Sequence, residues 1–206
     1  MYMHPSLIEY KYENEESLRS FLQDEKWSDP HHLARLYRYA KSEIPKEGLI
    51  LEIGCNFGES TIVMGHAIRG SKKHIVTIDP VFRFPELLVP DDQNPGGNVY
   101  NAPLLSVMDE ISAHHLDGYI SIVPQYSYEA IKSWDGREID MLFIDGEHTY
   151  EGVKKDCAWL SHVKKGGLVL FDDWYPPIER GAREKMAEMG GWKMIEQSRA
   201  IIFRRE

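Results

Sequence analysis

Three carboxylates stand where two buried strands are expected to end. The apolar run Met141–Ile144 is followed by Asp145, and the apolar run Leu168–Phe171 is followed by Asp172 and Asp173. The carboxyl ends of neighbouring parallel strands meet at one edge of a sheet, so the three side chains should lie close together. Their mutual repulsion must then be offset by protonation or by a cation. Because oxygen-only ligands favour hard ions, the trio predicts a Mg²⁺ site, with Ca²⁺ or Mn²⁺ as alternatives.

His148 lies three residues beyond Asp145, and these two are the candidate catalytic residues. A metal ion can hold two adjacent hydroxyl oxygens of a substrate and lower the pKa of one of them. His148 is then placed to remove the proton from that oxygen. Two structural interpretations stay open: one of Asp172 and Asp173 could only cap the following helix, and His148 could be a structural hydrogen-bonding residue.

A glycine loop, Gly54-Cys55-Asn56-Phe57-Gly58, follows the apolar run Leu49–Ile53. A turn of this kind after the first strand is where nucleotides dock in open α/β sheets. A dinucleotide loop would have glycines at positions 54, 56 and 59, with the pyrophosphate against the helix N-terminus. Here position 56 is Asn and position 59 is Glu, and a carboxylate at that helix start repels a pyrophosphate. The loop therefore favours a ligand with a positive centre and no phosphate, such as S-adenosylmethionine.

Asp79 ends the next apolar run, 25 residues after Gly54 (79 − 54). A carboxylate there is placed to accept hydrogen bonds from ribose hydroxyls. NAD would use the same contact, so Asp79 alone does not distinguish the two cofactors. The alternative without a ligand is a structural turn followed by a solvated aspartate.

The elements that must position these residues alternate along the chain. Expected strands are Leu49–Ile53, Ile75–Ile78, Tyr119–Val123, Met141–Ile144 and Leu168–Phe171, and expected helices between them are Glu59–Arg69, Leu104–His115, Tyr128–Trp134 and Tyr150–Val163. Such alternation implies right-handed crossovers and a Rossmann-like α/β fold with a doubly wound, mostly parallel sheet. After a helix over Ile178–Met189, the runs Trp192–Glu196 and Ala200–Phe203 predict an antiparallel C-terminal hairpin.

The N-terminal residues have helical periodicity, and Asp29-Pro30 is a favourable helix start. We expect residues 1–47 to form a helical lid or cap and residues 48–206 to form the domain that carries the chemistry. The proline-rich segment Phe82–Pro103 is too long for a simple connection and is either a second lid or a disordered excursion.

Composition narrows the class of protein. The 206 residues include 24 basic and 33 acidic side chains, which gives a net charge of −9 and argues against binding to nucleic acid. No apolar stretch approaches the ~20 residues that a membrane span needs. Two cysteines, Cys55 and Cys157, cannot form a disulfide framework, so we expect a cytoplasmic, reducing environment. The pairs His31-His32 and His114-His115 lack the spacing of metal ligands, and we expect solvated helix residues there.

The two motif blocks together resemble class I S-adenosylmethionine-dependent methyltransferases. The matching segments are Leu51–Gly54, Gly58–Thr61 and Ile139–Glu151, and the last continues through Val153, Asp156 and Trp159 to Gly166-Gly167 and the acidic pair. Within that class the segments are most similar to the metal-dependent small-molecule and sugar O-methyltransferases, relatives of the macrolide-sugar and cephalosporin-biosynthesis enzymes. The likeness covers residues 33 to 175 and makes residues 48–206 a class I methyltransferase domain.

The resemblance implies specific roles. Cofactor contacts are implied at Glu52, Gly54, Asn56, Gly58, Ser60, Asp79, Ser127 and Asp145. Metal ligation is implied for Asp145, Asp172 and Asp173, with His148 beside the methyl acceptor. Relatives usually have Gly-Asp before the serine that this chain keeps as Ser127, whereas here the pair is Gln125-Tyr126, which leaves the contact to the adenine edge open. A His-Asp pair is common in the group where this chain has Asp172-Asp173, and that change favours a metal.

The implied activity is transfer of a methyl group from S-adenosylmethionine to a hydroxyl oxygen of a small molecule or sugar, assisted by Mg²⁺ or another hard divalent cation. Two other classes stay open: an NAD-binding Rossmann oxidoreductase, and a non-catalytic protein that binds S-adenosylmethionine. We expect a small-molecule acceptor, with neither nucleic acid nor membrane as a partner, and homo-oligomerisation stays open.

Overall fold

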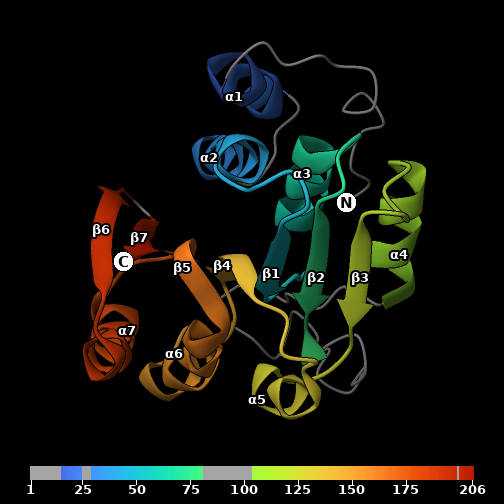
Figure 1. Cartoon of the computed structure of the whole chain (residues 1–206). Helices are drawn as coiled ribbons and strands as arrows, with labels where there is room; N and C mark the ends of the chain where they lie inside the picture. Colours follow the sequence, from blue (N-terminus) through green and yellow to red (C-terminus); the bar gives the residue numbers. More distant parts are fainter. Residues whose placement is uncertain (1–14, 25–28, 81–103, 199) are drawn as a thin grey trace, which may run out of the picture.

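A seven-stranded sheet runs through the part of the chain that the computed structural model describes, residues 15–24, 29–80, 104–198 and 200–206 (Figure 1). Its strands are β1 (Leu49–Ile53), β2 (His74–Ile78), β3 (Ile120–Val123), β4 (Ile139–Ile144), β5 (Val163–Phe171), β6 (Trp192–Gln197) and β7 (Ile201–Arg205). They lie in the order β3-β2-β1-β4-β5-β7-β6. The first five strands are parallel, while β7 is antiparallel to both β5 and β6. The predicted doubly wound, mostly parallel sheet with an antiparallel C-terminal hairpin is confirmed.

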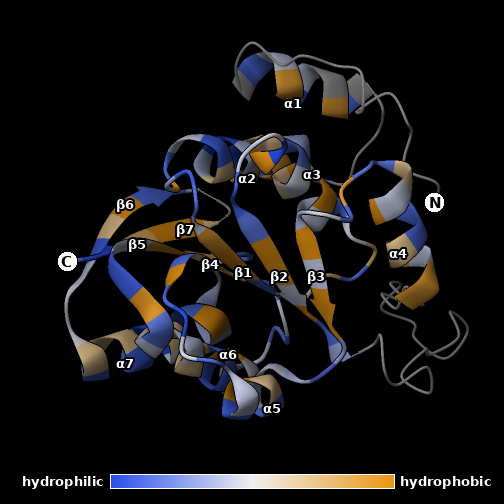
Figure 2. Ribbon diagram, turned by 45° about the vertical axis from the view of Figure 1, so that its right-hand side comes forward, coloured by the Kyte–Doolittle hydropathy of each residue, from blue (hydrophilic) through white to orange (hydrophobic). Residues whose placement is uncertain are grey.

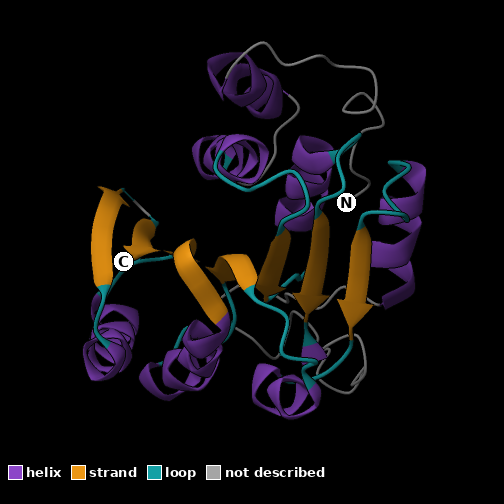
Figure 3. Ribbon diagram, in the orientation of Figure 1, coloured by secondary structure: helices purple, strands orange, loops and turns teal. Residues whose placement is uncertain are grey.

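Helices cover both faces of the sheet (Figures 1 and 3). One face carries α2 (Pro30–Ser42), α3 (Glu59–Ile68) and α4 (Leu104–Ala113), with α1 (Glu15–Asp24) packed on α2; the other carries α5 (Ser127–Ala130), α6 (Tyr150–Asp156) and α7 (Pro176–Met189). Turns of 3₁₀ helix at Ile131–Ser133 and Cys157–His162 extend α5 and α6. This layering explains the continuous apolar runs of the central strands β1 and β4, because every residue of these two strands is buried.

The central strand β4 shows how the two cores are built. Met141 and Phe143 belong to the core under α2 and α3, while Leu142 and Ile144 belong to the core under α6 and α7. Successive side chains of a strand point to opposite faces, so an uninterrupted apolar run serves both cores at once. Figure 2 shows the strands as the hydrophobic centre of the molecule between helices with polar outer faces.

Helix α2 begins where the sequence predicted. The Asp29 side chain accepts a hydrogen bond from the backbone amide of His32 (3.0 Å), and Pro30 occupies the first turn. Leu33, Leu36 and Ala40 lie in the core that α2 shares with α3 and the sheet. The division of the chain into a cap of residues 1–47 and a domain of residues 48–206 stays a prediction.

The largest boundary difference is at β5. The predicted helix Tyr150–Val163 ends at His162, and β5 already begins at Val163 rather than at Leu168. Val163 is buried and pairs with Ile139 of β4, and a register irregularity between this pair and the pair Met141–Leu168 absorbs the residues between them. Pairing with β4 therefore extends the strand beyond the apolar run that predicted it.

The segment Phe82–Pro103, predicted as a lid or an excursion, lies outside the described residues. Within the described ranges, no helix has the length and apolar character that a membrane span requires.

The order of the strands creates a crevice. The chain moves from β1 outward through β2 and β3, then returns to place β4 on the other side of β1. Loops that leave the carboxyl ends of β1 and β4 therefore diverge to opposite faces of the sheet. Open α/β sheets bind ligands at such switch points.

Candidate active site

A cavity of about 1010 Å³ opens at the carboxyl ends of β1 and β4. Its walls are the glycine loop after β1, the ends of β2, β4 and β5, the start of α2 and the start of α5. The predicted site residues that line it are Gly54, Asn56, Ser60, Asp79, Ser127, Asp145, His148, Asp172 and Asp173. Most of the side chains singled out in the sequence thus meet in one place.

Gly54 allows the loops after β1 and β4 to touch. It has a positive φ of 87°, and its amide donates to the carbonyl of Ile78 at 2.9 Å. A Cβ at this position would lie 2.0 Å from the carbonyl oxygen of Asp145. Any side chain here would therefore push apart the two loops that form the floor of the cavity.

Asp79 shapes the glycine loop from the next strand. Its Oδ2 accepts hydrogen bonds from the backbone amides of Cys55 (2.9 Å) and Asn56 (3.0 Å). Asn56 adopts the left-handed conformation, with φ of 47°, and the Asp79 contact stabilises that turn. Asp79 also lines the cavity, so it is placed for the predicted ribose contact, which stays a prediction.

Glu52 and Gly58 lie behind the cavity wall. Glu52 is fully buried on β1, and its two oxygens accept hydrogen bonds from the hydroxyls of Ser60 and Thr61, each at 2.5 Å. Burial raises the pKa of Glu52 to about 7, against the effect of these hydrogen bonds. Gly58, with φ of 86°, starts α3 and directs Glu59 and Ser60 into the cavity wall. Glu52 therefore reaches the cavity through Ser60.

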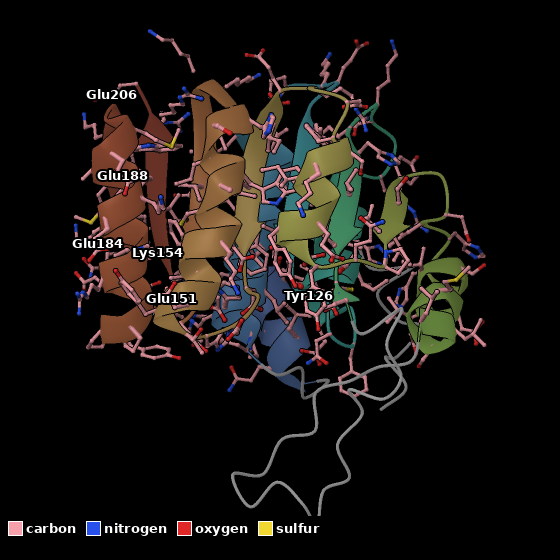
Figure 4. All side chains as sticks on the ribbon, turned by 90° about the horizontal axis from the view of Figure 1, so that it is seen from below. Tyr126, Glu151, Lys154, Glu184, Glu188 and Glu206 are labelled. Carbon is pink, nitrogen blue, oxygen red and sulfur yellow. The ribbon has the colours of Figure 1, made fainter. Side chains whose placement is uncertain are left out.

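Two tyrosines flank Ser127, and the first of them, Tyr126, belongs to the pair that stands where relatives have Gly-Asp. The rings of Tyr126 and Tyr128 are stacked, with centroids 5.2 Å apart and planes 19° apart, and both line the cavity; Tyr126 is labelled in Figure 4. Between them, Ser127 donates its hydroxyl to the buried carboxylate of Asp156. The sequence did not mark Tyr128 or Asp156 as site residues, because nothing in their local spacing shows that α5 and α6 face one ligand.

His148 lies between two of the predicted carboxylates. Its Nε2 is 3.0 Å from Asp145 Oδ1, and its Nδ1 is 3.5 Å from Asp173 Oδ2. Asp173 adopts a left-handed conformation, with φ of 48°, two residues after β5 ends at Phe171. Its side chain thereby reaches His148 on the neighbouring loop.

The charges of this group are interdependent. The hydrogen bond to Asp145 raises the pKa of His148, and the nearby charges of Asp145, Asp173 and Asp172 act in the same direction against desolvation. Burial raises the pKa of Asp145 to about 7. The charge of each side chain therefore depends on the protonation of the other.

Two expectations about histidines were wrong. His32 is only 7% exposed, lies 5.5 Å from the ring of Phe143 and lines the cavity. The signal was its spacing, because His32 precedes the buried Leu36 by four residues and so shares its helix face. His114 is 1% exposed, with Nδ1 2.9 Å from His66 Nε2, where α4 packs beside α3.

The predicted metal ligands do not converge. Asp145 and Asp173 flank His148, whereas Asp172 faces His32, with Oδ1 3.6 Å from His32 Nδ1. Among the residues that the structure describes, no group of three or more His, Cys, Asp or Glu side chains could hold a metal ion. The prediction that Asp145, Asp172 and Asp173 share a Mg²⁺ ion is therefore not supported by their geometry. Each of these acids is paired with an imidazole instead.

Comparisons with known proteins bear on the family. A family model described as a methyltransferase domain matches residues 51–174. Uncharacterized protein R132 of Acanthamoeba polyphaga mimivirus is 36% identical over 61 residues, which cover 27% of this chain and 28% of that protein. The chain thus matches less than a third of that relative's length.

Solved structures share the fold. The O-methyltransferase NovP superposes with a TM-score of 0.71 at 17% identity, over 86% of this chain and 80% of NovP. The calicheamicin methyltransferase CalS11 has a TM-score of 0.63 at 18% identity, over 97% and 88%. An O-methyltransferase from Bacillus cereus in complex with S-adenosylhomocysteine has a TM-score of 0.61 at 15% identity, over 98% and 94%. The family model spans more than half of the chain, and the glycine loop and the ends of β2, β4 and β5 that line the cavity fall within it, so the chain belongs to the methyltransferase-domain family.

Proposed function

We propose that this protein methylates a hydroxyl oxygen of a small molecule. The observation that carries the proposal is the position of His148, which lies in the cofactor cavity within hydrogen-bond distance of Asp145. A base so placed can take the proton that a hydroxyl must lose when it is methylated. The O-methyltransferases NovP and CalS11 share the fold and support a hydroxyl acceptor.

The cavity suits the cofactor in shape and charge. Asp79 offers an acceptor for the ribose, and the stacked Tyr126 and Tyr128 offer an aromatic wall for the adenine. Glu59, in the first turn of α3, places negative charge where a dinucleotide would need to put its pyrophosphate. The same charge attracts the sulfonium and ammonium groups of S-adenosylmethionine.

S-adenosylmethionine supplies the methyl group, which the acceptor oxygen attacks in line with the departing sulfur. The chain's contribution is to hold that oxygen about 3 Å from the methyl carbon. With its Nε2–H donated to Asp145, His148 takes the acceptor proton on Nδ1, and Asp173 at 3.5 Å stabilises the imidazolium that forms. Asp145 also fixes the tautomer and the orientation of the ring.

We assign the acceptor side of the cavity to the start of α2, since Asp29, His32 and Leu33 belong to the cavity lining. This supports the proposal that the N-terminal residues 1–47 act as a cap over the acceptor. Divalent-metal assistance remains a separate hypothesis that the positions of the three aspartates do not support. Methyl transfer in the presence of EDTA tests this hypothesis, because full activity in the chelator would show that the reaction needs no divalent metal.

The test of the base is His148→Gln. Transfer from labelled S-adenosylmethionine to a panel of catechols and sugar diols should fall by about 10²–10⁴-fold, the usual contribution of general-base catalysis. Affinity for S-adenosylhomocysteine should stay within about threefold, because the nucleoside contacts are on other loops. His31→Gln, an exposed histidine on α2, is the matched control. Wild-type rates in His148→Gln would show that His148 is not the base.

A further inference from the structure

The cavity contains a second histidine–carboxylate pair, deeper than the first. The side chains of His32 and Asp172 are each 8% exposed, against 39% and 29% for the side chains of His148 and Asp145. His32 Nδ1 lies 3.6 Å from Asp172 Oδ1, and both residues line the cavity. A buried polar pair that faces a ligand cavity is a candidate for contact with that ligand.

Both members of the pair are held rigidly. The backbone amide of His32 donates to the Asp29 side chain, and the His32 ring packs against Phe143 of β4 with an interplanar angle of 37°. The backbone amide of Asp172 donates to the carbonyl of Ile144 at 3.0 Å, which continues the pairing of β5 with β4. The pair is thus set by a helix start and a strand end, which are rigid supports for a binding contact.

The backbone separates the two neighbouring acids. Asp172 continues from β5 and faces His32, whereas the left-handed turn at Asp173 directs that side chain to His148. Consecutive Cα atoms are about 3.8 Å apart, so the two pairs lie within the reach of one small molecule. The end of β5 therefore places one carboxylate beside each of two imidazoles in the same cavity.

The distance within the deeper pair suits a bridging hydroxyl. A nitrogen and an oxygen 3.6 Å apart are too far for a direct hydrogen bond, but a hydroxyl oxygen can lie about 2.8 Å from both. Such a hydroxyl accepts from the imidazole N–H and donates to the carboxylate, as a bridging water does. An acceptor without that hydroxyl would leave both groups buried without this bridge.

We propose that His32 and Asp172 bind a second hydroxyl of the acceptor, next to the hydroxyl that is methylated beside His148. This inference rests on the proposed function and narrows its substrate class to vicinal diols. His32 and Asp172 then determine which acceptors bind, while His148 acts on the reacting oxygen.

The experiment is calorimetry on the whole chain saturated with S-adenosylhomocysteine, with matched pairs of probes. Catechol is compared with phenol, and cis-cyclohexane-1,2-diol with cyclohexanol. We expect the wild type to bind each diol about tenfold more tightly than its mono-ol, the effect of one hydrogen-bonded hydroxyl in a buried site. His32→Phe keeps the ring against Phe143 but removes its N–H groups, so the preference should fall to twofold or less.

Three further variants make the result specific. His32→Asn restores a hydrogen-bond donor and should recover part of the diol preference. Asp172→Asn should weaken the diol preference, because it removes the carboxylate that accepts a hydrogen bond from the second hydroxyl. His31→Phe, a change of the same kind at an exposed neighbour, should leave the preference at the wild-type value. His32→Asn and Asp172→Asn also keep the test valid if His32→Phe does not fold.

The outcomes separate the two proposals. Failure of the wild type to bind S-adenosylhomocysteine would contradict the proposed function itself. If the wild type binds S-adenosylhomocysteine but binds diol and mono-ol with equal affinity, only the role of His32 and Asp172 would be overturned. The same conclusion would follow if it bound neither probe measurably. An unchanged diol preference in both His32→Phe and Asp172→Asn would overturn it as well.

Discussion

Several acidic side chains of this site lie beside a hydroxyl group or an imidazole. Glu52 is held by Ser60 and Thr61, and Asp156 by Ser127. The sequence could place the acids at strand ends, because a buried run followed by a carboxylate is a local pattern. It could not supply all their partners, because the contact between Asp172 and His32 joins residues 140 positions apart. The sequence therefore predicted a metal site at these acids and did not predict that His32 lies beside Asp172.

Glu52 makes stability depend on pH. Burial holds its pKa at about 7 in the folded chain, above the ordinary value of 4.5. The folded state therefore favours the protonated acid, and this contribution is complete below about pH 4.5 and is lost as the pH rises through about 7. Relative to Glu52→Gln, the wild type should lose about 2 kcal/mol of unfolding free energy between pH 5 and pH 8.

Urea unfolding of both proteins at pH 5, 6, 7 and 8 measures this difference. Glu138→Gln, a change of the same kind at an exposed position, is the control. Parallel pH profiles for Glu52→Gln and the wild type would contradict the assignment of a neutral Glu52 in the folded protein.

Among the elements, α2 contributes residues to the cavity although nothing in its own sequence predicts that position. It brings Asp29, His32 and Leu33 to the cavity, and its other face binds Glu196 of β6 through three residues. Glu196 Oε2 accepts hydrogen bonds from Arg38 Nη2 at 2.6 Å and from the Tyr39 hydroxyl at 2.7 Å, and its Oε1 forms an ion pair with Arg35 Nε at 2.6 Å. The last strands of the chain thus hold the helix whose first turn lines the cavity.

Glu196→Ala should release this contact. Two hydrogen-bond donors, Arg38 and Tyr39, and the ion-paired Arg35 lose a charged partner, so the unfolding free energy should fall by about 2 kcal/mol, or about 5 °C in Tm. Glu47→Ala removes one exposed carboxylate that pairs with Lys72, and it should cost less than about 0.5 kcal/mol. Thermal unfolding measures the decrease in Tm for both variants. An equal decrease would show that Glu196 contributes no more than an exposed ion pair.

Element positions were largely predictable because their signals are local. Apolar runs marked the first strand at its observed bounds, and Asp29-Pro30 marked the start of α2. The early start of β5 was not predictable, because Lys164, Lys165 and Gly166 look like a loop until pairing with β4 is known. The close approach of α3 and α4 around His66 and His114 was hidden for the same reason.

In the molecule as a whole, the strand order decides where chemistry can occur. The reversal between β1 and β4 opens the crevice, and Gly54 lets the two loops of its floor meet. Alternating helices and strands predicted the doubly wound sheet, and Asp145 and Asp79 were therefore expected near the glycine loop. Which N-terminal side chains complete the cavity depends on how α2 packs on the sheet, and no local pattern encodes that.

The central claim is that this cavity binds a sulfonium nucleoside and not a dinucleotide. Calorimetric titration with S-adenosylhomocysteine and with NAD⁺ tests it most directly, using the wild type, Gly54→Ala and the control Gly118→Ala, which has open space around its Cβ. We predict saturable binding of S-adenosylhomocysteine to the wild type and to Gly118→Ala, at least tenfold weaker binding to Gly54→Ala, and no measurable binding of NAD⁺. Saturable binding of NAD⁺ to the wild type, without binding of S-adenosylhomocysteine, would contradict the account.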